Sequence, residues 1–199
     1  QDPSGGQNGE LGLWRAKVAN QALGYVCEGR LAVLATQEVS RGTVTMTQVN
    51  VNGSLTARTG SLTLTESSVS AKTSVSLYRQ AMIYNNSFQG AVSIASRDEV
   101  EFTQNYIQQV IQVNGISAGG GLQIESEHAT IYGNMIDGGS YGVTTRGSAN
   151  ISNNLITQMS MYGIWSLPDS ETPSGLDNTI NNNTLVANMN GLSLEGTVN

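Results

Sequence analysis

A six-residue phrase recurs along this chain, and it constrains the fold more than any other feature of the sequence. The phrase reads apolar-x-x-Asn-x-apolar. Complete copies span residues 83–88, 102–107, 131–136, 151–156 and 180–185, and degenerate copies span residues 46–51 and 64–69. The copies start 18, 19, 19, 29, 20 and 29 residues apart, which is one regular period with two longer steps. A period of about 20 residues is typical of a solenoid, in which each repeat is one structural unit.

Each repeat also carries signals for short strands. A second phrase, apolar-x-apolar, follows each copy of the first, as in Val75/Leu77. A weaker apolar column lies two residues before the first phrase, as in Val44. Alternation with a period of two residues predicts strands, and stacking successive repeats at about 4.8 Å gives each strand a parallel neighbour. A tandem of βαβ units is the main alternative, but no helical segment separates the strands after Thr43.

The recurrent asparagine predicts a bend inside the phrase. Strict alternation would point only one of the two flanking apolar residues inward, so both face a core only if the chain bends between them. Asparagine tolerates left-handed backbone angles, and we assign the bend to it. Stacked turns would then form a ladder in which each amide donates to the next and accepts from the last. The predicted ladder consists of Asn86, Asn105, Asn134, Asn154 and Asn183.

At these residues the chain resembles the right-handed parallel β-helix superfamily, the pectin-lyase-like fold with its asparagine ladder. It is most similar to the carbohydrate-binding and sugar-hydrolysis type of β-helix repeat, over roughly residues 43–195. The resemblance implies an all-β, right-handed parallel β-helix solenoid of about seven to eight turns, at the cell surface or outside the cell. It implies no single activity, because the same coil carries lyases, hydrolases, epimerases, phage fibres and adhesins. We assign residues 43–199 to the β-helix, and residues 1–42 to an N-terminal cap or irregular first turn.

Both ends of a solenoid expose strand edges and therefore require cover. Apolar residues spaced along residues 11–24 predict a short amphipathic capping helix. The alternative takes residues 18–23 as another copy of the phrase, with Leu31 and Val33 as its second strand. No capping segment follows Leu194. We therefore expect a fragment of a larger protein, or a partner at that edge, including end-to-end self-association.

Charge excludes several classes of partner. Charged residues make up 12% of the chain, about half the usual share, and the formal net charge is −6. An acidic chain lacks the basic stripe that nucleic acid requires, and it is not attracted to acidic membranes. No apolar run is long enough for membrane insertion. The single cysteine, Cys27, excludes an intramolecular disulfide.

Charged residues gather just after the second strand of successive repeats, at one corner of the coil. If the chain is an enzyme, we expect a polysaccharide lyase or glycoside hydrolase site there, built from Asp98, Glu127, His128 and Arg146. Acids at such a corner are also the ligands that Ca²⁺ prefers. The alternative is a solvated turn whose arginines neutralise the acids. No Ser/His/Asp, Cys/His or metal-ligand spacing occurs, so we expect neither catalytic residues nor a metal site.

Outward aromatic residues are the stronger binding signal. Alternation turns Tyr84, Tyr132 and Trp165 outward on a polar wall, where aromatic faces suit the stacking of sugar rings. The alternative is that the loop at residues 167–177 folds back over Trp165. That loop and residues 108–121 are the two insertions, and loops on a rigid scaffold often carry function.

The sequence therefore predicts a non-catalytic structural or binding module of a secreted or surface protein. It would contact a polysaccharide or a protein surface through its side wall and inserted loops. Ice binding is a further candidate, because Thr43/Thr45/Thr47 and Thr63/Thr65 begin a regular threonine row.

Overall fold

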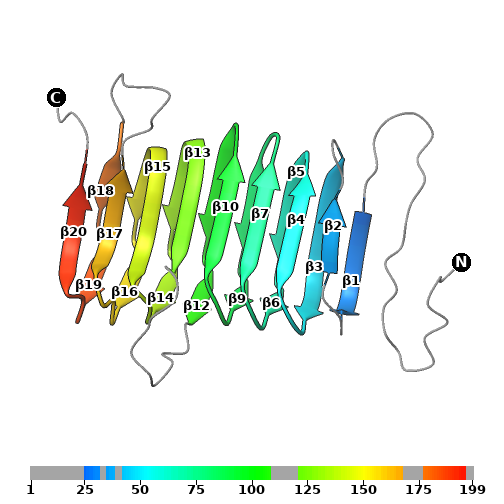
Figure 1. Ribbon diagram of the computed structural model, residues 1–199, viewed down its shortest axis with the longest axis horizontal. Coiled ribbons are helices and arrows are strands. Elements are labelled where there is room, and N and C mark those ends of the chain that lie inside the picture. Colours follow the sequence, from blue (N-terminus) through cyan, green and yellow to red (C-terminus); the bar gives the residue numbers. More distant parts are fainter. Residues whose placement is uncertain (1–24, 32–34, 39–41, 109–120, 168–176, 196–199) are drawn as a thin grey trace, which may run out of the picture.

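The computed structural model describes residues 25–31, 35–38, 42–108, 121–167 and 177–195. These residues form 20 strands and no helix. Neighbouring strands pair in parallel, one turn of the chain apart, and the strands follow one another along the long axis of a rod (Figure 1). For the described residues, the prediction of an all-β fold with parallel stacking is therefore confirmed. The predicted capping helix at residues 11–24 lies outside the described residues.

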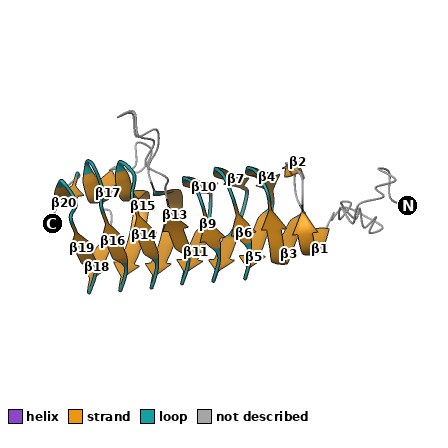
Figure 2. Ribbon diagram, turned by 90° about the horizontal axis from the view of Figure 1, so that it is seen from below, coloured by secondary structure: helices purple, strands orange, loops and turns teal. Residues whose placement is uncertain are grey.

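Each turn contributes strands to three walls. Wall A contains β1 (Tyr25–Leu31), β3 (Thr43–Val51), β5 (Ser61–Thr65), β8 (Ala81–Tyr84), β11 (Glu99–Thr103) and β18 (Thr179–Asn181). Wall B contains β6 (Ser68–Val69), β9 (Ser87–Phe88), β12 (Tyr106–Gln108), β14 (Met135–Asp137), β16 (Leu155–Thr157) and β19 (Thr184–Val186). The end of β3 also reaches wall B, where Asn50 and Val51 pair with β6. Wall C contains β2 (Ala35–Glu38), β4 (Leu55–Thr59), β7 (Thr73–Leu77), β10 (Val92–Ser96), β17 (Tyr162–Leu167) and β20 (Asn190–Leu194). In Figure 2 the strands of wall C run along the upper side and those of wall A along the lower side.

Two long strands, β13 (Leu122–Tyr132) and β15 (Tyr141–Ser152), begin on wall C and continue round the corner onto wall A. Their pairing shifts register at the corner, after Glu125 pairs with Arg146 and before His128 pairs with Ser148. Gly147 absorbs this bulge with a φ of 100°, and a Cβ there would overlap the backbone of Ser126.

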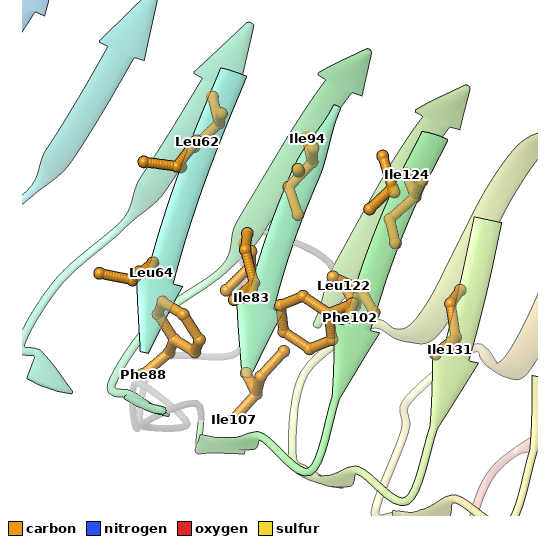
Figure 3. Packing of buried hydrophobic residues seen from close by; sticks show 14 of the residues in the cluster. Leu62, Leu64, Ile83, Phe88, Ile94, Phe102, Ile107, Leu122, Ile124 and Ile131 are labelled. Carbon is orange, nitrogen blue, oxygen red and sulfur yellow. The ribbon is translucent and has the colours of Figure 1, made fainter. Parts of the chain in front are cut away.

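The core is a set of apolar columns that run along the axis. On wall A, each turn adds the first apolar residue of the phrase, from Met46 through Ile83 and Phe102 to Ile151. On wall B, each turn adds the second apolar residue of the phrase, as in Val69, Phe88, Ile107 and Ile136. All of these side chains are buried, and Figure 3 shows four of them, Ile83, Phe88, Phe102 and Ile107, pointing into the space between the walls. Their burial supplies the main driving force for the fold, at about 1.5–3 kcal/mol for each large side chain.

The predicted columns therefore fill the interior, and the aromatic pair Phe88 and Phe102 stacks there with ring centroids 6.0 Å apart. Not every inward residue is apolar. Thr73 and Thr145 on wall C are buried, and their hydroxyls have no hydrogen-bond partner among the described residues.

The left-handed bend falls one residue before the position that the sequence suggested. Gln48, Glu66, Asn85 and Gln104 have φ angles of 50–55°, and Gly133 takes the same place with a φ of 66°. The ladder asparagines that follow them do not have a positive φ. Assigning the left-handed angle to the ladder asparagine was therefore wrong. Its role is to satisfy the backbone just after the bend, and the residue before it carries the unusual conformation.

Hydrogen bonds link the five asparagines from turn to turn. The backbone N–H of Asn86 donates to the Oδ1 of Asn105 at 2.9 Å, and the backbone N–H of Asn105 donates to the Oδ1 of Asn134 at 2.8 Å. The same pattern continues through Asn154 to Asn183, at 2.9 and 3.0 Å. Each Nδ2 also donates to a carbonyl of the preceding turn, for example from Asn134 to Phe102 at 2.9 Å. The buried bend thus has partners for its polar groups.

The turn before Thr43 already belongs to the strand ladder. Cys27 pairs with Met46 and Leu31 pairs with Val51, with a register shift between Glu28 and Gly29. Leu31 therefore occupies the end of the first phrase. Interpreting it as the start of a second strand was wrong, because β2 supplies that strand and pairs Ala35 with Leu55.

Candidate functional site

The four residues of the possible catalytic site lie on three successive turns, and the backbone N–H of His128 donates to the carbonyl of Asp98 at 3.2 Å. Asp98 lies in the turn between β10 and β11, Glu127 and His128 lie on β13, and Arg146 lies on β15. All four are exposed, and within the described residues no hydrogen bond or ion pair involves their side chains. The register places Glu99, not Glu127, beside His128. General acid and base catalysis requires groups within hydrogen-bond reach of one another or of a shared water, and this corner offers solvated side chains.

Within the described residues, no group of three or more His, Cys, Asp or Glu side chains is placed to hold a metal ion. Arg97 is the one charged residue of this corner with a ring contact among those described, because its guanidinium lies 5.6 Å from the centroid of Tyr78.

The three predicted aromatic residues lie on two different walls. Tyr84 and Tyr132 stand outward on wall A and are 40% and 44% exposed. They share one column, and Thr103 lies between them, so their backbones are about 10 Å apart by the parallel-strand spacing. Trp165 stands outward on wall C. One flat ligand therefore does not contact all three rings at once.

Trp165 belongs to a cluster of three aromatic rings. Its ring centroid lies 5.1 Å from that of Tyr141 and 5.7 Å from that of Tyr162, and the two tyrosine rings are 6.2 Å apart. The three ring planes differ by only 14–25°. The centroids thus form a nearly equilateral triangle of offset, almost parallel rings, the arrangement that aromatic quadrupoles favour. All three side chains are half-buried, so each ring keeps part of its surface open to solvent.

A hydrogen bond orients the indole at the edge of this cluster. Trp165 Nε1 donates to the Oε1 of Glu195 at 2.8 Å, beyond the end of β20. In register, Thr144 and Ser193 flank Trp165 on the neighbouring strands. The alternative that a loop covers Trp165 concerns residues 168–176, which lie outside the described residues. Among those described, its ring contacts are the two tyrosines.

A column of glycines explains why the chain reaches this geometry. Gly142, Gly163 and Gly191 occupy equivalent positions on wall C, just before the inward apolar residue of each strand. A Cβ at Gly142 would overlap the Ile156 side chain and the carbonyl of Gly163. The absence of side chains here lets walls B and C meet closely, and the preceding tyrosines then stack above one another.

Sequence reasoning missed Tyr141 and Tyr162. The signal was present as Tyr-Gly-apolar, which occurs at residues 141–143 and again at residues 162–164, one repeat apart. Alternation along the apolar-x-apolar phrase marks only the residues within that phrase, and both tyrosines lie two residues before it.

Two shallow hollows lie elsewhere on the walls. One, of about 530 Å³, is on wall C, where Ser76 and Ala95 lie between Arg58 and Glu125, beside Tyr78 and Arg97. The other, of about 560 Å³, lies outside the asparagine bend, between walls A and B.

The threonine row is short. Thr45 and Thr47 pair with Thr63 and Thr65, and the hydroxyls of Thr47 and Thr65 are 3.0 Å apart. The next turn places Met82 and Tyr84 in these columns. The preceding turn places Val26 and Glu28 there. The regular array therefore covers only two turns.

The fold defines this chain as a parallel β-solenoid with polar walls and an aromatic cluster on one of them. No protein-family model, curated protein or solved structure matches the chain. None of the described residues forms a helix of the length and apolarity needed to cross a membrane.

Proposed function

We propose that this chain is a non-catalytic binding module of a secreted or cell-surface protein, and that it contacts glycan through wall C. The observation that carries the proposal is the cluster of Tyr141, Tyr162 and Trp165. In this proposal the solenoid takes the right-handed, pectin-lyase-like form, because connections between parallel strands are right-handed in nearly all proteins.

The cluster suits a sugar ligand for physical reasons. A pyranose ring has an apolar face of C–H groups, and an aromatic surface desolvates that face while leaving the hydroxyls in water. The three rings already contact one another, so little side-chain freedom is lost when a ligand binds. Glu195 is exposed beside the indole, and its carboxylate offers a hydrogen-bond acceptor for hydroxyls.

The competing surface is wall A, with Tyr84 and Tyr132. Their rings have no ring partner among the described residues, and each keeps its rotamer freedom at 40% and 44% exposure. A ligand must order these side chains on binding, at a cost of about 0.5–1.5 kcal/mol for each. This difference favours the cluster on wall C.

The direct test is affinity electrophoresis in gels that contain one neutral polysaccharide, such as hydroxyethyl cellulose, arabinoxylan or galactomannan. We expect retardation in at least one gel. Trp165→Ala should weaken that affinity by about tenfold or more, which corresponds to about 1.4 kcal/mol. Tyr84→Ala is the matched control, because it removes an exposed ring from wall A. Loss of retardation in Tyr84→Ala but not in Trp165→Ala would move the site to wall A.

The enzyme alternative requires a separate assay. Incubation with acidic and neutral polysaccharides should yield no product, because Asp98, Glu127 and Arg146 are exposed and do not interact with one another. Reproducible product formation that Arg146→Ala abolishes would overturn the non-catalytic proposal.

A contact at the C-terminal edge is part of the same proposal. Val186, Met189, Leu192 and Leu194 on the last described turn are 47–77% exposed. We expect a protein surface, or a further turn of a longer chain, to cover this edge. Sedimentation of Leu192→Ser and of the parent chain over a range of concentrations tests this contact, and equal behaviour of the two would argue against it.

A further inference from the structure

The hollow outside the asparagine bend has a polar lining that extends beyond the ladder residues Ser67 and Asn86. Its floor on wall B is formed by Ser68 and Ser87, which lie in one column between the larger residues Asn50 and Tyr106. Small side chains on two middle turns, with larger ones on the turns at each end, produce the depression of about 560 Å³.

A row of left-handed residues borders this floor. Gln48, Glu66, Asn85 and Gln104 occupy the bend on four successive turns, and all four side chains are exposed. The row spans three strand spacings, or about 14 Å. Glycine would adopt this backbone at lower cost, and Gly133 takes the same position on the next turn. Asparagine tolerates this conformation, but Gln48, Glu66 and Gln104 keep long polar side chains where the backbone disfavours them, and this points to a role for those side chains.

The hydrogen-bonding capacity of this lining is only partly used. Gln48 Nε2 donates to Glu66 Oε2 at 2.9 Å, and Ser68 Oγ donates to Asn50 Oδ1 at 3.0 Å. The side-chain amides of Asn85 and Gln104, and the hydroxyl of Tyr106, have no partner among the described residues. Each amide group presents donors and an acceptor side by side.

The chemistry of the lining selects one class of ligand. A hydroxyl group both donates and accepts, and so it matches an amide better than an ion does. Neither Lys nor Arg lines the hollow, and the carboxylate of Glu66 repels anions. The half-buried ring of Tyr106 forms one end wall, on which an apolar sugar face can pack.

We propose that this hollow is a second binding site, for a neutral, polyhydroxylated ligand such as an uncharged oligosaccharide. The site lies on the A–B side of the coil, and it is independent of the aromatic cluster on wall C. The amides of Asn85 and Gln104 hydrogen-bond the ligand's hydroxyls, and Tyr106 packs against one ring.

Glycine substitution separates binding from folding at this site. The double variant Asn85→Gly/Gln104→Gly removes both amides and keeps the left-handed backbone, so it should fold. Asn153→Gly is the matched control, because Asn153 has the same left-handed conformation, with a φ of 57°, and does not line the hollow. Trp165→Ala removes the wall C contribution.

The experiment is a ¹H–¹⁵N NMR titration of the full chain with cellohexaose, mannohexaose and xylohexaose, each in turn, and with hexagalacturonate as the anionic comparison. We expect at least one neutral probe to shift the backbone amides of Ser68, Ser87 and Tyr106. The double glycine variant should weaken this binding by about tenfold or more, whereas Asn153→Gly and Trp165→Ala should leave it unchanged.

Three outcomes would overturn the inference. The first is that no neutral probe shifts these amides. The second is that only hexagalacturonate does so. The third is that the shifts persist at full affinity in the double glycine variant. Shifts confined to residues around Trp165 would support the wall C proposal and still reject this site, so the two proposals fail separately.

Discussion

The asparagine ladder permits a quantitative prediction at its centre, Asn134. This side chain is 2% exposed and makes four hydrogen bonds. Its Oδ1 accepts from the backbone N–H of Asn105 at 2.8 Å and from the Nδ2 of Asn105 at 3.3 Å. Its Nδ2 donates to the carbonyl of Phe102 and to the Oδ1 of Asn154, both at 2.9 Å.

In Asn134→Ala these partners lose the amide group, and because the position is buried, no water replaces it. The orphaned backbone N–H costs about 1–3 kcal/mol, and each other lost bond costs about 0.5–1.5 kcal/mol. We therefore expect a loss of about 3–5 kcal/mol in the free energy of unfolding. That is a large share of the total stability of a domain, which is typically about 5–15 kcal/mol.

Two neighbouring asparagines provide internal controls. Asn183→Ala removes the half-buried ladder residue of the last described turn, where solvent can replace the lost bonds, and it should cost about 1 kcal/mol. Asn153→Ala changes the exposed left-handed residue next to the ladder, and the loss of asparagine's tolerance of that conformation should also cost about 1 kcal/mol.

Urea unfolding followed by circular dichroism measures all three variants. The midpoint should fall most for Asn134→Ala, with an unchanged dependence on urea concentration. Equal losses for Asn134→Ala and Asn183→Ala would refute the reasoning, because burial is the only difference that the estimate uses.

Further predictions concern backbone and core positions, and the same unfolding assay checks each. Gly142→Ala should cost about 3 kcal/mol or more, because the new Cβ overlaps Ile156, whereas Gly191→Ala should cost less than about 1 kcal/mol, since its nearest neighbour atom would be 3.6 Å away. Glu66→Gly should leave stability unchanged or raise it by up to about 1 kcal/mol, because it relieves a left-handed glutamate. Thr145→Val should stabilise by about 1 kcal/mol, because it removes a buried hydroxyl without a partner. A destabilising Glu66→Gly or Thr145→Val would contradict the corresponding argument.

The interior could be predicted from the sequence because burial imposes one constraint on every turn. Ile83, Phe102 and Ile131 must all be apolar, since each packs against the one before it. Because burial acts on every turn, apolar residues recur at the same positions of each repeat, and this periodicity alone predicts the parallel stacking. The left-handed position was assigned one residue too late because its residue type varies from turn to turn, as in Gln48, Asn85 and Gly133, whereas the asparagine that follows it recurs in every complete copy of the phrase.

The walls were harder to predict, because no such constraint acts on outward residues. Trp165 was placed correctly as outward by alternation, but its partners came from positions that the apolar phrases do not mark. At the charged corner, the register between β13 and β15 shifts at Gly147, so that His128 aligns with Ser148, and on its other side His128 aligns with Glu99 of β11. A one-residue bulge moves side chains to new neighbours and leaves no mark in the apolar periodicity.

The outward columns change residue type from turn to turn, and this variation affects which kind of ligand the walls can bind. A column that starts with Thr47 and Thr65 continues as Tyr84, Thr103 and Tyr132, although the backbone spacing stays constant. A crystalline surface such as ice requires the same group on every turn, and two turns of threonine bury too little area for that purpose. A flexible ligand requires only a few well-placed contacts on a rigid wall, and clusters that differ from turn to turn provide them. The walls therefore suit the proposed recognition of a discrete ligand better than lattice matching, and the aromatic cluster and the hollow beside Tyr106 are the two proposed sites.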